Sequence, residues 1–113
     1  MNRYIIKAAQ HPKSDPFGFS EATDHVYLFA RGLKDLRDTI RCITPQGYNV
    51  RSPRWFGKRL KSGKLTLNNP LLRTTMYEIR QVDSELKVEH EFDFTNRTKF
   101  QHRLKIVSVE NWK

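Results

Sequence analysis

The most restrictive feature of the sequence is the alternation of apolar and polar residues over its last forty positions. This alternation predicts three β-strands, at Arg73 to Val82, Glu85 to Phe94 and Thr98 to Val109. Strands separated by such short connections usually pair with their neighbours in the sequence. We therefore expect a three-stranded antiparallel meander at this end of the chain.

The register of these strands follows from their apolar positions and from two short turns. A turn at Thr95-Asn96-Arg97 pairs Phe92 with Phe100, His90 with His102, Val88 with Leu104 and Leu86 with Ile106. On the other face the same register sets opposite charges against each other, at Asp93–Lys99 and Glu89–Arg103. A turn at Asp83-Ser84 then brings Tyr77 beside His90. The expected result is one row of Tyr77, His90 and His102 across the three strands.

The first part of the chain predicts two strands and two helices. The strands are expected at Arg3 to Ala8 and His25 to Arg31, with a loop at His11 to Asp24 between them. The spacing of Leu33, Leu36, Ile40 and Ile43 predicts a helix that ends at Thr44-Pro45-Gln46-Gly47. Ser52-Pro53 and Gly63 delimit a second, short helix at about Pro53 to Ser62. We expect Lys64 to Leu72 to be a connection.

These elements indicate a single α+β domain over residues 1–113, because a chain of this length can bury one core. The expected order is two N-terminal strands, two short helices and the meander, with the helices packed on one face of the sheet. In layout this order is similar to that of the RelE-like ribosome-dependent RNase toxins. No motif of that family maps onto this sequence residue by residue, and the strand at His25 to Arg31 departs from its plan.

Positive charge is concentrated in one part of the chain. Residues Thr39 to Tyr77 contain no Asp or Glu but hold eight of the 21 basic residues, and the other 13 are nearly balanced by 12 acidic ones. Tyr48, Trp55 and Phe56 are interleaved with these cations. Basic residues mixed with aromatic rings suit a polyphosphate whose bases can stack.

The sequence therefore favours a small nucleic-acid-binding protein, of DNA or RNA. The residues expected to contact the nucleic acid or another partner are Arg51, Arg54, Trp55, Lys58, Arg59, Lys61 and Lys64. Two alternatives stay open for the same residues. The segment could be a solvated loop whose Trp55 and Phe56 only fill the core. It could also dock on an acidic protein surface or a nucleoprotein complex, as an inhibitor of the mobile-element or phage accessory type does.

A second alternative is a small metal-independent ribonuclease. In the expected row, His90 and His102 could act as general base and acid, in either order, and Tyr77 could orient one of them. Arg73 or an arginine of the acid-free stretch could bind the phosphate. The competing interpretation is an aromatic band inside the core. Zinc binding by the two histidines, completed by His25 or a carboxylate, is a further alternative, although the sequence contains no recognised metal motif. No cofactor is indicated.

The single cysteine, Cys42, cannot form an internal disulfide, and we expect it to serve packing. The N-terminal apolar run is broken by Lys7 and is too short for a signal peptide or a membrane span. We therefore expect a cytoplasmic protein without membrane contact. The sequence leaves the oligomeric state open.

Overall fold

The computed structural model describes residues 2–9, 25–44, 49–69 and 74–112. The loop expected at His11 to Asp24, the helix end at Pro45 to Gly47, and the side chains of Tyr48 and Arg73 lie outside these residues. In the described part, no helix is long and apolar enough to cross a membrane.

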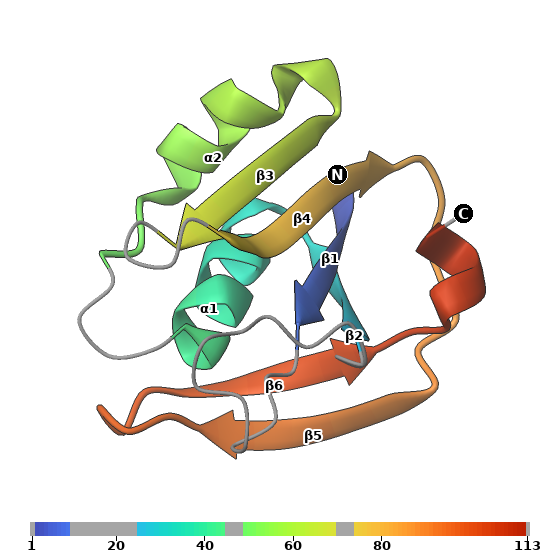
Figure 1. Cartoon of the computed structure of the whole chain (residues 1–113). Helices are drawn as coiled ribbons and strands as arrows, with labels where there is room; N and C mark the ends of the chain where they lie inside the picture. Colours follow the sequence, from blue (N-terminus) through green and yellow to red (C-terminus); the bar gives the residue numbers. More distant parts are fainter. Residues whose placement is uncertain (1, 10–24, 45–48, 70–73, 113) are drawn as a thin grey trace.

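The protein is an α+β structure built on a six-stranded antiparallel sheet with two α-helices (Figure 1). The strands are β1 (Arg3–Ala9), β2 (His25–Arg31), β3 (Lys64–Asn69), β4 (Thr74–Val82), β5 (His90–Thr95) and β6 (Gln101–Ile106). The α-helices are α1 (Leu33–Ile43) and α2 (Pro53–Arg59), and two 3₁₀ helices follow at η1 (Leu60–Ser62) and η2 (Val109–Trp112). The expected strands and helices of the first 62 residues are thus present.

The order of strands in the sheet is β3-β4-β1-β2-β6-β5. Two predictions for the second half of the chain were wrong: the connection at Lys64 to Leu72 and the three-stranded C-terminal meander. First, Lys64–Asn69 is an edge strand paired with β4, not a connection. Second, β4 pairs with β1 and β3 and has no pairing with β5, so two strands separate it from β6.

The β5–β6 hairpin forms, but in a different register. His90 lies opposite Ile106, Phe92 opposite Leu104 and Phe94 opposite His102. The expected turn of three residues is in fact longer, because Thr95 pairs with Gln101 and leaves residues 96–100 between the strands. Asn96 organises this turn: its side-chain oxygen accepts hydrogen bonds from the N–H of Thr98 (3.0 Å), the hydroxyl of Thr98 (2.8 Å) and the N–H of Phe100 (2.9 Å).

Apolar side chains cover both faces of the sheet. On the helix side, Tyr4 and Ile6 of β1 pack with Leu36 and Ile40 of α1 and with Phe56 of α2. On the opposite side, a smaller cluster joins Ile5, Phe29 and Val107 to Trp112 of η2. Both α-helices therefore lie on one face, as the sequence indicated, and η2 closes the other face.

The β5–β6 hairpin is attached loosely to the rest of the sheet. A single residue pair, Leu28 with Ile106, joins β2 to β6 in the ladder. One further backbone bond runs from the N–H of Val107 to the carbonyl of Tyr27 (2.9 Å). In Figure 1 the hairpin forms the bottom of the molecule, whereas α2 runs beside β3 at the top.

Candidate nucleic-acid interface

The local sequence fixes the start and the end of α2. The hydroxyl of Ser52 accepts a hydrogen bond from the N–H of Trp55 (3.2 Å), and Pro53 occupies the first turn, where a missing N–H costs nothing. Gly63 adopts a left-handed conformation (φ 89°) that ends η1 and turns the chain into β3. These three residues act as the sequence predicted.

Burial of one side of this helical segment turns the opposite side toward solvent. Phe56 and Leu60, four residues apart, are almost completely buried in the main core. Gly57 allows close approach to α1, because a β-carbon at this position would lie 2.9 Å from Cδ1 of Leu33. The helix is therefore held by packing, and its basic residues are left at the surface.

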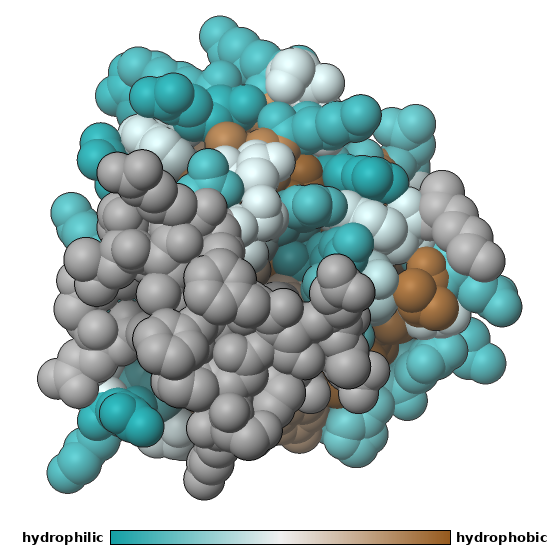
Figure 2. Space-filling view, viewed as in Figure 1, coloured by the Kyte–Doolittle hydropathy of each residue, from teal (hydrophilic) through white to brown (hydrophobic). Residues whose placement is uncertain are grey.

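Six basic side chains on and beside α2 are exposed. None of them forms an ion pair with a carboxylate in the described ranges, although six ion-pair contacts occur elsewhere in those ranges. We call these six residues the basic segment: Arg51, Arg54, Lys58, Arg59, Lys61 and Lys64. Figure 2 shows hydrophilic side chains gathered at the top of the molecule, over α2 and β3.

Trp55 differs from the freely stacking ring that the sequence suggested. It is half-buried against the main core and meets Phe56 edge to face, with 5.2 Å between ring centroids. The guanidinium groups of Arg51 and Arg59 lie 5.3 and 5.1 Å from the centroid of its ring. Trp55 thus positions two arginines by cation–π contacts, and its own stacking on a base stays a prediction.

The row of Tyr77, His90 and His102 does not form. Tyr77 lies on β4, where it pairs with Ala8 of β1 and Leu67 of β3. Its hydroxyl donates to the carbonyl of Ile43 (3.2 Å) and lies 3.1 Å from the hydroxyl of Thr44, so it secures the end of α1. The row was wrong because it depended on a β4–β5 pairing that is absent and on the shifted β5–β6 register.

His102 instead belongs to a cluster that the sequence did not predict. Its Nε2 lies 2.8 Å from Oδ1 of Asp35, and Nζ of Lys105 lies 3.2 Å from Oδ2 of the same carboxylate. Asp35 also accepts a hydrogen bond from the N–H of Arg31 (2.8 Å). The three side chains are 13–19% exposed. This cluster joins the start of α1 to β6 where the β2–β6 ladder is interrupted.

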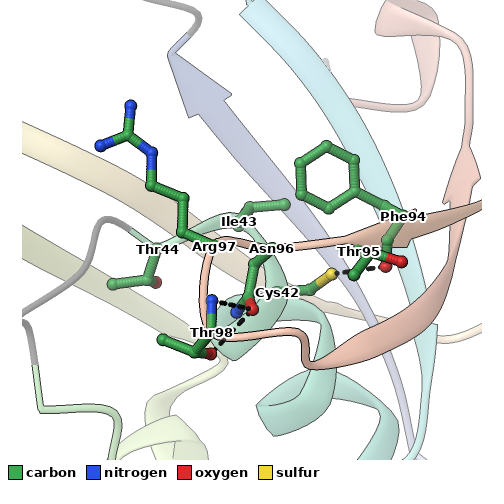
Figure 3. A pocket seen from close by; sticks show the side chains of 8 residues that line it. All are labelled: Cys42, Ile43, Thr44, Phe94, Thr95, Asn96, Arg97 and Thr98. Carbon is green, nitrogen blue, oxygen red and sulfur yellow. Dashed lines mark hydrogen bonds between the residues drawn. The ribbon is translucent and has the colours of Figure 1, made fainter.

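A cavity of about 390 Å³ opens between the end of α1 and the β5–β6 turn (Figure 3). It is lined by Cys42, Ile43, Thr44, Phe94, Thr95, Asn96, Arg97 and Thr98. The thiol of Cys42 donates to the carbonyl of Phe94 (3.3 Å), and burial raises the pKa of this thiol. A buried, protonated thiol is a poor nucleophile, which agrees with the packing role expected for Cys42.

Three further cations surround this turn. Arg97 lines the cavity, Lys99 lies in the turn, and the guanidinium of Arg41 lies 4.1 Å from the centroid of Phe100. All three side chains are exposed, and within the described ranges none is paired with a carboxylate. The sequence places Arg41 in the stretch without Asp or Glu, Thr39 to Tyr77, but does not connect it with the β5–β6 turn.

Comparisons of the chain with models of protein families, with curated proteins and with solved structures gave no match in any of the three. We therefore infer a function from the side chains themselves.

Proposed function

We propose that the protein binds nucleic acid through the basic segment on α2, η1 and the start of β3. The observation that carries this proposal is the group of six exposed cations, Arg51, Arg54, Lys58, Arg59, Lys61 and Lys64, that lack ion pairs with the described carboxylates. Phosphate groups supply the compensating charge, and binding gains free energy because condensed counterions leave the nucleic acid.

The contacts of Trp55 support this function through the orientation of two arginines. A guanidinium that lies over an aromatic ring keeps its N–H groups directed outward in its plane, where they can donate to phosphate oxygens. Arg51 and Arg59 are held in this way, on either side of Trp55 in the sequence. Their side chains lose less conformational entropy on binding than free arginines would.

The same surface would attract an acidic protein, so an inhibitor that docks on a larger complex is the main competing function. The phosphate proposal is preferred because the six cations spread along a helix, a 3₁₀ turn and a strand edge, as suits a phosphate backbone. A pull-down from nuclease-treated lysate separates the two. A partner protein retained after nuclease treatment, without direct binding of nucleic acid, would overturn our proposal.

The direct test is titration of labelled single-stranded RNA, single-stranded DNA and duplex DNA by fluorescence anisotropy at several salt concentrations. With four to six phosphate contacts on duplex DNA, the slope of log K against log salt is expected at roughly −4 to −5. The RNA is then run on a gel, where it should remain intact. Cleaved RNA would favour the ribonuclease alternative, and a flat salt response would contradict phosphate binding.

A further inference from the structure

We propose that the cavity between the end of α1 and the β5–β6 turn accepts a base of a single-stranded nucleic acid. The inference rests on the proposed function, because the basic segment supplies the general affinity for phosphate. The cavity adds a preference for single strands over duplexes. The juxtaposition that carries it is a cavity with an exposed aromatic ring in its wall and, around it, three cations that no described carboxylate pairs.

The walls of the cavity are held in place by hydrogen bonds within the protein. The hydroxyl of Thr44 is bonded to the carbonyl of Ile40 and contacts Tyr77, and the hydroxyl of Thr98 donates to Asn96. The amide of Asn96 donates to the carbonyl of Arg41 (3.2 Å). Because these groups are already satisfied, the cavity is preformed and offers shape and apolar surface. We therefore expect little discrimination among bases.

Phe94 supplies the stacking surface. Its side chain is 39% exposed, although it belongs to the face of the hairpin that carries Phe92 and Phe100. The ring of Phe92 meets it edge to face at 6.4 Å between centroids, which fixes its orientation without covering it completely. Figure 3 shows the Arg97 side chain extending from the turn and the Phe94 ring extending from β5, with Ile43 between them in this view. A planar base could lie against Phe94 with its phosphate toward Arg97.

The charge around the cavity selects an anionic ligand. Arg97 lines it, Lys99 lies in the same turn, and Arg41 of α1 lies against Phe100 of that turn. The cavity has no acidic residue among its described lining residues. The carboxylate nearest to it in the sequence, Asp93, forms an ion pair with Arg103. A planar group joined to a phosphate satisfies both the aromatic wall and these cations. That combination is a nucleotide unit.

A duplex cannot use the cavity without disruption, because its bases are stacked inside the helix and must be unstacked at a cost of a few kcal/mol. An unpaired base has no such barrier. Loss of the aromatic wall should therefore weaken the binding of single strands and leave the binding of duplexes unchanged.

The experiment compares Phe94→Ala with Val109→Ala, which truncates the other exposed large apolar residue of the described ranges, one outside the cavity. The probes are a labelled eight-nucleotide oligothymidine and a labelled twelve-base-pair duplex DNA. Phe94→Ala is expected to lower the affinity for oligothymidine about tenfold without a change for the duplex. Phe94→Tyr should restore the affinity for oligothymidine, and Val109→Ala should bind both probes as the wild type does.

A second variant, Arg97→Gln, tests the phosphate contact without touching the apolar wall. It should lower the affinity for oligothymidine and reduce its salt slope by about 0.7, again without an effect on the duplex. Equal binding of oligothymidine by wild type and both variants would overturn the cavity proposal alone, provided that the duplex still binds with a steep salt dependence. A wild type that binds neither probe would overturn the proposed function and this inference together.

Discussion

The side chain of Asp35 contacts three residues from other elements. One carboxylate accepts from the backbone of Arg31 and contacts both His102 and Lys105, which are 67 and 70 residues away in the sequence. The first-turn position of Asp35 in α1 is favourable for a carboxylate in any helix, so its local role could be expected from the sequence. Its contacts with His102 and Lys105 could not be expected from the sequence, because they depend on the register of β6.

We predict that Asp35→Asn destabilises the protein by about 2 kcal/mol, because Lys105 would keep its charge at a site where it is only 13% exposed. The free energy of unfolding is measured by urea denaturation. The control is Asp93→Asn, which removes an exposed ion pair with Arg103 and should change stability by less than about 0.5 kcal/mol. Equal effects of the two substitutions would contradict the role assigned to the cluster.

The thiol of Cys42 gives a second prediction at this scale. Burial raises its pKa, so the folded protein keeps the thiol protonated at a pH where the unfolded chain begins to ionise. Its reaction with a disulfide reagent at pH 8 should be at least about tenfold slower in the folded protein than in urea. By the same linkage, stability should fall as pH rises above the ordinary cysteine pKa. A fast reaction of the native thiol would contradict this burial.

At the scale of elements, the sequence predicted both α-helices but missed the 3₁₀ helix η2 and assigned the last strands to the wrong neighbours. Capping and periodicity are local, and they sufficed for α1 and α2. Lys64–Asn69 does show the alternation of a strand, with Leu67 buried and Thr66 exposed, but Asn68-Asn69-Pro70 resembles a turn. The pairing of β4 with β1 joins segments some seventy residues apart, and no local pattern specifies such a contact.

The error in the β5–β6 register has a clear physical cause. The observed and expected registers keep the same residues on each face, and both set opposite charges against one another, so neither criterion could distinguish them. The side chain of Asn96 decides between them, because it organises a five-residue turn. The candidate catalytic row failed because of this register and because β4 does not pair with β5. The basic segment is continuous in sequence, so its location did not depend on any pairing, and its role in binding stays a prediction.

We predict that Asn96→Ala lowers the free energy of unfolding by about 1–2 kcal/mol, because donors of Thr98 and Phe100 lose their acceptor. Asn96→Asp keeps an acceptor oxygen and loses only the donation to the carbonyl of Arg41. Asn96→Asp should therefore recover most of the free energy of unfolding that Asn96→Ala loses. Hydrogen exchange of the amide of Phe100 reports the turn directly. Unchanged exchange in Asn96→Ala would mean that the strands alone hold the register.

At the scale of the whole molecule, the two edges of the sheet differ in charge. The edge formed by β3 adjoins the basic segment, whereas the opposite edge strand, β5, carries Glu91 and Asp93. A polyanion approaching such a surface is attracted more strongly to the edge formed by β3. We infer that a duplex lies along α2 and β3, and that only a single strand also reaches the β5–β6 turn, at the cations Arg97 and Lys99.

The most direct test of this account is the salt dependence of duplex DNA binding in two matched lysine variants. Lys61→Gln removes one charge from the basic segment, and Lys87→Gln removes one exposed charge from the chain between β4 and β5. We predict that Lys61→Gln makes the slope of log K against log salt shallower by about 0.9, whereas Lys87→Gln leaves it unchanged. Identical slopes in the wild type and both variants would contradict phosphate binding by the basic segment.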